Sequence, residues 1–508
     1  MAVQTHWVQN FKGKSDRAAP GASPVITNDL RNVKCFHGHV RPRNGMSNYN
    51  SISSASSAEI IGLFHYPLIS GTNQLLRMLP TKLELLGASS WSDVTGTALT
   101  GTTTTRPQHT IIDDTLVFTN EGEDLPRKYT GSGNSTVIAS STSPYGKAIQ
   151  HYLGFLLLGN VSDDGTFSDV TDGHRIIRYS DDWDNDWSLC NGNEIVLWET
   201  PGALLRMLVL GRDVMCYKSD GLVRLTWVGG NVVFKQEKVD FNIGFVSPLG
   251  IWAVNDEFHL GLGNDGVIYA ITTSDVQPVS FDQLYKTIPN TISLNKLKYA
   301  RGVDNSEESI SYLFYDRTGL STQLLDSYVS YNYRDRSWDT GQLGKQIISS
   351  SIHKPLANSP LDLVVSTATL VNEFDTGSAT NDDGTAISSY WTTGPQNFGE
   401  EGWMVGARLI FDKPTGHNAH VRVSVAMDGS NSFQFPAMFR LVGGAVDDDF
   451  VEVSYRPPSQ FGNYFNVKVE FKSSSLGAGV ELRRVGFEIE TTKASRTRPT
   501  REHDSLAL

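Results

Sequence analysis

An acidic segment is the first candidate for metal chemistry. Residues 182–186, with the sequence Asp-Trp-Asp-Asn-Asp, space three carboxylates as the start of an EF-hand calcium loop does. Such a loop needs glycine at its sixth position and a bidentate glutamate at its twelfth, but Trp187 and Asn193 stand there. The EF-hand motif is therefore incomplete. A solvated loop is the simpler interpretation, and a looser calcium site remains open that would add Asp163, Asp164 and Asp172.

A second group of metal-ligating residue types lies near the N-terminus. Side chains two residues apart on a strand share a face, so His37 and His39 could contact the same ion. A site normally needs a third ligand, and no strong one follows nearby in the sequence. Cys35 lies on the same predicted face, which keeps the possibility open without making it a prediction. We predict neither a metal nor a cofactor.

A glycine-rich segment matches the first part of a dinucleotide-binding motif. Residues 261–266 read Gly-Leu-Gly-Asn-Asp-Gly, but the third glycine of that motif must open a helix. The following residues 267–271 are strand-like, so a hairpin turn is predicted instead. The chain contains no nucleophile elbow and no complete phosphate loop, and we predict no catalytic residue. Carboxylate pairs that meet only in space remain open.

Short strands and turns must position all of these residues. Residues 214–225 and 258–269 both read as strand, Asp-Gly turn and strand, and Gly221 and Gly266 are 45 positions apart. Weaker copies recur at steps of about 50 residues, a spacing typical of propeller blades. We predict an all-β chain with a β-propeller of about seven blades over residues 56–375. Six or eight blades, or stacked sandwiches, are the alternatives.

The rest of the chain differs in pattern. Residues 385–491 contain longer strands with strict alternation, which predicts a C-terminal β-sandwich. Residues 1–55 are interpreted as an N-terminal arm or peripheral hairpin, and residues 492–508 as a basic flexible tail. The side chains expected in the sandwich core are Val421, Val423, Val425, Val467, Val469 and Phe471.

Composition limits the function classes. The formal net charge is −12, from 43 basic and 55 acidic residues, which disfavours sequence-specific nucleic-acid binding. Three cysteines at wide spacings cannot form a disulfide framework, so folding in a reducing cytoplasm is expected. Neither a membrane-spanning run nor a secretory signal is expected.

Several short motifs occur in a familiar order: residues 38–46 (Gly-His-Val-Arg-Pro-Arg-Asn-Gly-Met), Arg-Tyr-Ser-Asp at 178–181 before Trp187-Ser188, residues 264–269 before Val279-Ser280, and residues 331–338. Together with the hairpin repeats and the closing sandwich, this order resembles the tail nozzle proteins of short-tailed bacteriophages. These are also described as tail tubular or packaged-DNA stabilisation proteins. The resemblance covers most of residues 30–490.

The resemblance implies a homo-hexameric ring below the portal and adaptor, located in the virion tail, with the protein synthesised in the host bacterial cytoplasm. The ring would retain packaged DNA and conduct it during ejection without specific binding. A needle or plug and fibres or spikes would be further partners. If an acidic lumen repels DNA, basic residues are expected at ring or partner contacts, and we predict Arg41, Arg43, Arg496, Arg498 and Arg501.

Two other functions remain open. The first is a host-surface or carbohydrate-binding propeller, such as a receptor-binding tail protein, in which an exposed pair like Trp183 and Trp187 would stack on sugars. The alternative for these tryptophans is packing in a blade core. The second is a glycan-cleaving propeller, which would need two carboxylates about 5 to 10 Å apart in one pocket.

Overall fold

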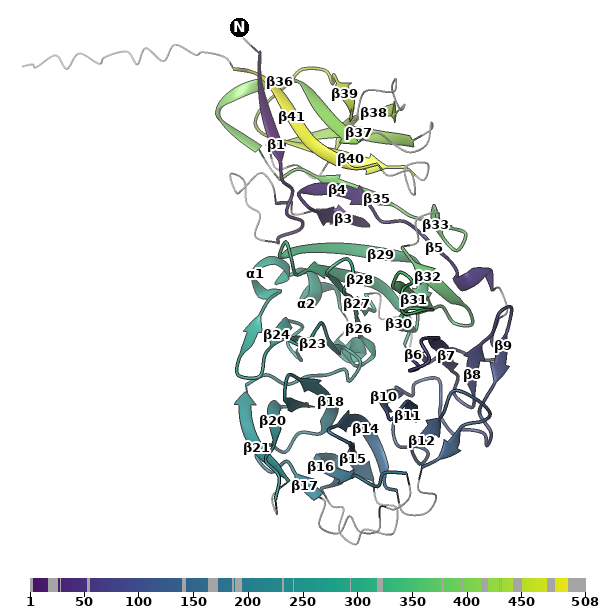
Figure 1. Cartoon of the computed structure of the whole chain (residues 1–508). Helices are drawn as coiled ribbons and strands as arrows, with labels where there is room; N and C mark the ends of the chain where they lie inside the picture. Colours follow the sequence, from purple (N-terminus) through teal and green to yellow (C-terminus); the bar gives the residue numbers. More distant parts are fainter. Residues whose placement is uncertain are drawn as a thin grey trace, which may run out of the picture.

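The chain folds almost entirely into β-strands. The computed structural model describes residues 3–16, 26–27, 29–52, 55–138, 143–162, 172–184, 187, 194–230, 233–240, 242–292, 294–317, 323–375, 379–394, 396–412, 419–428, 430, 432–441, 450–472 and 480–491. Within these ranges, seven small sheets surround an axis and a larger sheet lies beside them (Figure 1). No described helix is long and apolar enough to cross a membrane.

The first three blades are four-stranded antiparallel meanders. They consist of β6 (Gly62–Tyr66), β7 (Gln74–Met78), β8 (Leu83–Leu86) and β9 (Trp91–Asp93); of β10 (Gln108–Ile112), β11 (Thr115–Thr119), β12 (Arg127–Tyr129) and β13 (Thr136–Val137); and of β14 (Tyr145–Tyr152), β15 (Phe155–Ser162), β16 (Ile176–Ser180) and β17 (Glu194–Val196).

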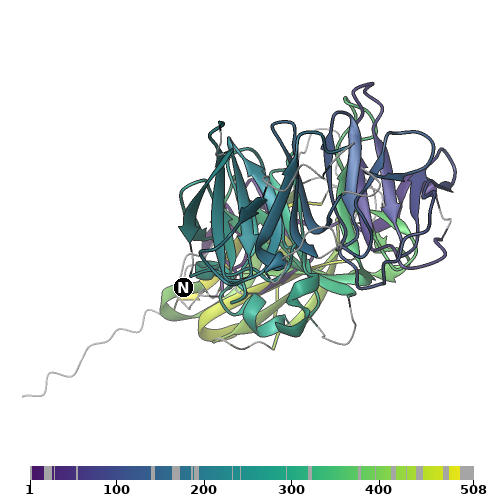
Figure 2. The same ribbon diagram turned by 90° about the horizontal axis from the view of Figure 1, so that it is seen from below.

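Blades four to six repeat this plan. Their strands are β18 (Leu204–Leu210), β19 (Asp213–Lys218), β20 (Gly221–Trp227) and β21 (Phe234–Asp240); β22 (Ile251–Ala253), β23 (His259–Leu262), β24 (Ile268–Ile271) and β25 (Val276–Pro278); and β26 (Arg301–Asn305), β27 (Ile310–Tyr315), β28 (Leu325–Asn332) and β29 (Ser337–Ile347). In the view turned by 90°, the blade strands run side by side across the thickness of the ring (Figure 2).

The two Asp-Gly turns lie at equivalent positions of neighbouring blades, which confirms the predicted repeat. One joins the second and third strands of blade four, and the other joins those of blade five. Gly266 has the predicted left-handed backbone, with φ of 79°. Gly221 does not have a positive φ. It already belongs to β20, where it pairs with Lys218, so the tight turn consists of Ser219 and Asp220.

The seventh blade combines both ends of the propeller. Its strands β30 (Ser349–His353), β31 (Asp362–Ser366) and β32 (Val371–Phe374) are followed by β5 (Met46–Asn48), which pairs antiparallel with β32. The short strands β33 (Asn381–Asp382) and β34 (Thr385–Ala386) extend this sheet. The propeller therefore includes residues from the segment expected to be a separate arm. Pairing with β5 covers the edge of β32 and closes the ring.

Apolar faces of adjacent blades pack together. One core cluster joins Leu157 and Ile177 of blade three to Met207 and Val214 of blade four. The short helices are α1 (Phe281–Leu284), α2 (Thr287–Thr291), η1 (Tyr49–Ser51), η2 (Gly173–Arg175) and η4 (Leu294–Tyr299). Of these, α1 and α2 cover the core between blades five and six.

The larger sheet folds into the predicted C-terminal sandwich. Its C-terminal strands are β35 (Ser389–Thr392), β36 (Gln396–Asp412), β37 (Ala419–Met427), β38 (Gln434–Leu441), β39 (Phe450–Tyr455), β40 (Gln460–Phe471) and β41 (Leu482–Thr491). All six side chains predicted for its core are at most 3% exposed and belong to one cluster. The alternation of apolar residues therefore fixes the register of β37 and β40.

The N-terminal segment is part of this sandwich. It supplies β1 (Val3–Gln9), β2 (Leu30–Arg31), β3 (Val33–Phe36) and β4 (His39–Pro42). Strand β1 pairs with β41 along its whole length, β2 pairs with β35, and Val40 of β4 pairs with Leu482 of β41. The predicted hairpin exists as β3 and β4, but it is not peripheral: Val33 and Val40 are buried in the sandwich core.

Candidate functional site: an acidic pocket between the arm and the propeller

Lys34 of β3 connects the N-terminal segment to the propeller. Its side chain is buried, and its Nζ lies 2.7 Å from Oε2 of Glu308, which follows β26, and also contacts Asp375 after β32. Burial alone would lower the pKa of Lys34, but Asp375, Tyr312 and Glu308 raise it well above the ordinary value. The ammonium group is therefore held in its charged form between two carboxylates from different blades.

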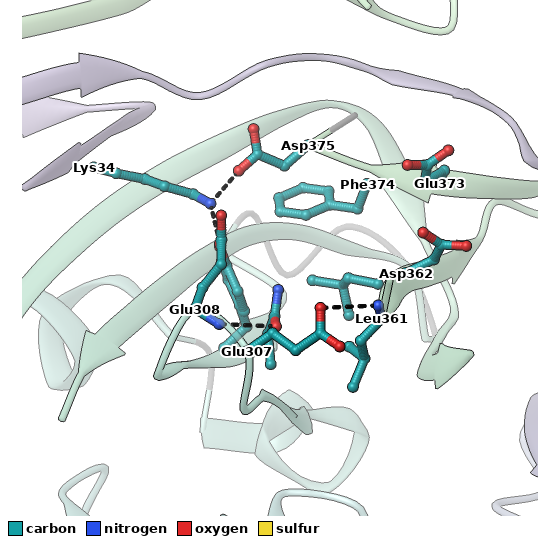
Figure 3. A pocket seen from close by; sticks show the side chains of 11 residues that line it. Lys34, Glu307, Glu308, Leu361, Asp362, Glu373, Phe374 and Asp375 are labelled. Atoms are coloured by element: carbon teal, nitrogen blue, oxygen red, sulfur yellow. Dashed lines mark hydrogen bonds and ion pairs between the residues drawn. The ribbon is translucent and has the colours of Figure 1, made fainter. Parts of the chain in front are cut away.

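A pocket of about 200 Å³ opens beside this lysine. Glu307 and Glu308 come from the β26–β27 turn of blade six, whereas Asp362 and Glu373 come from β31 and β32 of blade seven (Figure 3). With Asp375, the described lining contains five acidic side chains against one lysine. The remaining lining residues are Asn305, Tyr312, Leu361, Leu363 and Phe374.

The carboxylates of this pocket have unequal surroundings. Burial would raise the pKa of Glu308, but the charges of Lys34 and Arg41 and their hydrogen bonds keep it below the usual range. Burial raises the pKa of Asp362, and repulsion from Glu307 adds to that effect, although the Tyr49 hydroxyl donates a hydrogen bond to Asp362 Oδ2 at 3.2 Å. A cationic group entering beside Asp362 and Glu307 would relieve this repulsion.

The pocket is chemically suited to an ammonium or guanidinium group. Glu307 is 46% exposed at its side chain, and its Oε2 accepts a hydrogen bond from the Leu361 backbone N–H at 3.1 Å. Its Oε1 lies 3.6 Å from Nζ of Lys354, a partly exposed pair that an entering cation would have to share or displace. Charge-assisted hydrogen bonds to such carboxylates are stronger than neutral ones. Sequence analysis missed this site because its residues come from four separate segments. The adjacent acidic pair Glu307-Glu308 was the one local signal in the sequence.

The structure places the arginines predicted at ring or partner contacts in different surroundings. Arg41 is partly buried, and its Nη2 lies 3.0 Å from Glu308 Oε1. Arg43 is fully buried and donates two hydrogen bonds to Asp382, at 2.9 and 2.8 Å. Its guanidinium also lies over the Phe374 ring. Arg43 thus stabilises its own subunit and cannot lie at a subunit surface. The other three predicted residues, Arg496, Arg498 and Arg501, lie outside the described residues.

His37 and His39, the pair considered for a metal site, do not lie on the same face of one strand. His37 lies in the β3–β4 turn with φ of 50°, and its backbone N–H donates to Asp335. His39 instead lies near Asp412 and Glu481, with potential ligand atoms within 4.8 Å of one another. Asp412 is already paired with Arg483 through both carboxylate oxygens. This existing ion pair competes with any metal ion at that place.

The other predicted motifs have structural roles where they are described. Trp183 and Trp187 are buried, and Trp187 Nε1 donates to the Trp183 carbonyl at 2.8 Å, so they are core residues and cannot stack on a sugar as an exposed pair. Asp184 pairs with Lys128 of blade two. Asp182 is exposed, and its backbone N–H donates to Ser180 Oγ at 3.2 Å; Asp172 pairs with Arg175. The other carboxylates of the calcium hypothesis, Asp163, Asp164 and Asp186, lie outside the described residues. Residues 261–266 form the β23–β24 hairpin, as predicted.

Comparisons with known proteins add little to this geometry. No family model matches the chain, and no curated protein matches it. Similar solved structures include the Neurospora crassa Pan2 WD40 domain, with 9% identity and a TM-score of 0.36 over 65% of this chain and 94% of that one. The N-terminal domain of Nup159 shows 8% identity and a TM-score of 0.38 over 72% and 99%. A computationally designed protein, Ika8, shows 9% identity and a TM-score of 0.36 over 63% and 97%.

Proposed function

We propose that this protein is a structural component of a bacteriophage tail, a nozzle protein that forms a hexameric ring and conducts DNA during ejection. The observation that carries the proposal is the path of the N-terminal segment. This segment completes the sandwich through β1, contacts blade six through Lys34 and Arg41, and closes the propeller through β5. Propeller and sandwich are thereby connected at several points, which suits a ring that must resist the force of DNA passage.

The charge of the chain is compatible with DNA sliding. A net charge of −12 on each of six subunits would repel the duplex and keep it away from the wall. A lumen lined with lysine and arginine would bind phosphates and slow ejection in a salt-dependent way. The role is structural and needs no catalytic group, and the protein would reside in the virion tail.

The acidic pocket is the place where this proposal expects a neighbouring chain. The segment 492–508 carries Lys493, Arg496, Arg498 and Arg501, and its charge is complementary to that of the pocket. A basic segment of an adjacent subunit, or of the adaptor, would insert an arginine or lysine beside Glu307 and Asp362. Needle and fibre proteins would bind elsewhere on the ring.

Electron microscopy of the purified protein, with and without its adaptor, tests the ring. Six-fold particles are expected, and their assembly should weaken in the variant Glu307→Gln/Asp362→Asn. The matched control is Asp256→Asn/Glu257→Gln, which removes two exposed carboxylates in the β22–β23 turn, far from the pocket in sequence. A strictly monomeric or trimeric protein in the presence of the adaptor would contradict the nozzle role. Six-fold rings that both double variants form equally well would contradict only the pocket contact.

A further inference from the structure

A cavity of about 320 Å³ lies at the centre of the propeller. Its lining comes from the first strands of six blades, including His65 of β6, His109 of β10, Arg206 of β18, Trp252 of β22 and Arg301 of β26. First strands surround the axis of a propeller, so residues far apart in sequence face one another here. No residue of this cavity belongs to the acidic pocket described above.

Two arginines in this cavity have no acidic partner among the residues that the structure describes. Arg206 Nη1 donates to the carbonyls of Pro248 at 3.0 Å and Ile251 at 2.7 Å, and Arg301 Nη2 donates to the carbonyl of Ile61 at 2.8 Å. Within the described part of the chain, neither guanidinium forms an ion pair. Some buried arginines of the propeller do form one, as Arg77 with Glu84 and Arg178 with Glu194 show, whereas Arg127 also donates to backbone carbonyls. Arg301 is 8% exposed and Arg206 is half-buried. A guanidinium withdrawn from water without a counter-ion is costly.

Two further lining residues carry buried hydrogen-bond donors that are unpaired among the described residues. Trp252 is 5% exposed, and its Nε1 has no hydrogen-bond acceptor among the described residues. The hydroxyl of Ser350, on β30, is also buried and unpaired within those residues. An indole N–H can only donate, so it requires an acceptor that the described residues do not supply. The unsatisfied groups therefore share a preference for a ligand with several acceptor oxygens.

The remaining titratable groups do not neutralise the two arginines. Burial and the charges of Arg106 and Arg206 lower the pKa of Arg301 to about 9. Burial lowers the pKa of His109 to about 3, which leaves it neutral. The single carboxyl group among the lining residues is Asp304, and burial raises its pKa to about 7. Its Oδ1 accepts a hydrogen bond from Ser311, and it forms no ion pair with a described residue.

We propose that the central cavity binds the oxyanion group of a small molecule, a phosphate or a carboxylate. Arg206 and Arg301 supply the charge, and Trp252 and Ser350 donate directional hydrogen bonds. Such an anion satisfies the unpaired donors and reduces the repulsion between the guanidiniums. The cavity volume accommodates a compact metabolite-sized anion rather than a polymer. This inference concerns the axis of one propeller and does not depend on ring formation.

Isothermal titration calorimetry of the full chain in chloride-free buffer tests the site. Inorganic phosphate and sulfate form one arm, and succinate and citrate form the other, which separates phosphate-type from carboxylate ligands. We expect one site per chain for at least one arm, with a Kd below about 1 mM. Arg301→Gln or Arg206→Gln should weaken binding by about tenfold or more, and Trp252→Phe by about three- to tenfold.

The control variant is Arg127→Gln. Arg127 is also a buried propeller arginine that donates to backbone carbonyls, those of Thr95 and Thr97, but it lies outside the cavity. It should leave the affinity unchanged. Trp252→Phe and Ser350→Ala keep the shape of the cavity, so they remain informative if an arginine variant fails to fold. The proposal would be overturned if none of the four anions bound at a concentration of about 10 mM, tenfold above the expected upper limit of the Kd. It would also be overturned if wild type, Arg301→Gln and Trp252→Phe bound with equal affinity.

Discussion

The buried pair Arg43 and Asp382 offers the sharpest test of how the N-terminal segment is fixed to the propeller. Both side chains are completely buried, and two hydrogen bonds of 2.9 and 2.8 Å join them. Asp382 Oδ2 also accepts the Gly344 backbone N–H of β29 at 2.7 Å. Asp382→Asn would leave a buried guanidinium without its counter-charge. We therefore expect it to lower the free energy of unfolding by about 3–5 kcal/mol.

Neighbouring residues supply the control for this measurement. Asp383 pairs with Lys345 at 3.1 Å, but the lysine side chain is 43% exposed. Asp383→Asn should cost less than about 1 kcal/mol because exposed ion pairs contribute little. The double variant Arg43→Met/Asp382→Leu removes both charges together. It should recover most of the stability that Asp382→Asn loses.

Urea unfolding followed by tryptophan fluorescence and by limited proteolysis measures these effects. For a domain of this size, a loss of several kcal/mol should move the midpoint of the propeller transition by about 1 M urea or more. The two probes also show whether propeller and sandwich unfold together. A midpoint for Asp382→Asn within error of that for Asp383→Asn would refute the reasoning. It would mean that the pair is solvated or is not formed in solution.

Three further predictions follow from other contacts. Met46→Ala in β5 removes a buried side chain that packs in the core between blades six and seven, so trypsin should cleave the propeller faster, with a stability loss of about 2–5 kcal/mol. Burial raises the pKa of Asp339 to about 7, whereas the pKa of an aspartate in the unfolded chain is about 4. Between about pH 4 and pH 7 the native state therefore binds one more proton at this group than the unfolded state does. The free energy of unfolding should fall as the pH rises through that range. Asp339→Asn should flatten that part of the stability curve in pH-dependent urea titrations; an unchanged slope would contradict the assignment. The purified chain should release no reducing ends from host-surface polysaccharide, and measurable turnover would revive the glycan-cleaving alternative.

The sequence predicted those parts of the fold that depend on local pattern. Alternation in Val421, Val423 and Val425 identified a buried strand face, and the 45-residue step between two Asp-Gly turns identified adjacent blades. The sequence pattern did not predict β5. A strand of three residues is too short to show an alternation of apolar and polar side chains, and its pairing with β32 defines it. The surroundings of Arg43 were unpredictable for the same reason. Its partner Asp382 lies 339 positions later in the sequence, so the local sequence alone resembles that of an exposed basic residue.

The candidate sites were less predictable than the fold. The acidic pocket and the central cavity both collect single residues from several blades, and no spacing within one segment marks them. Arg206 and Arg301 occupy ordinary strand positions in the sequence. Their lack of acidic partners becomes visible only when the neighbouring first strands are in place.

The pairing of β1 with β41 determines the order in which the molecule can become complete. Val3 lies opposite Glu490, so β1 cannot pair until β41, far later in the chain, has been synthesised. During synthesis Val8 and the unpaired edge of β1 have no partner, and contacts of such long range form slowly. Blade seven has the same dependence, because β5 awaits β32. A chain interrupted before residue 482 would lack β41, and with it the partner of β1 and of Val40 in the sandwich.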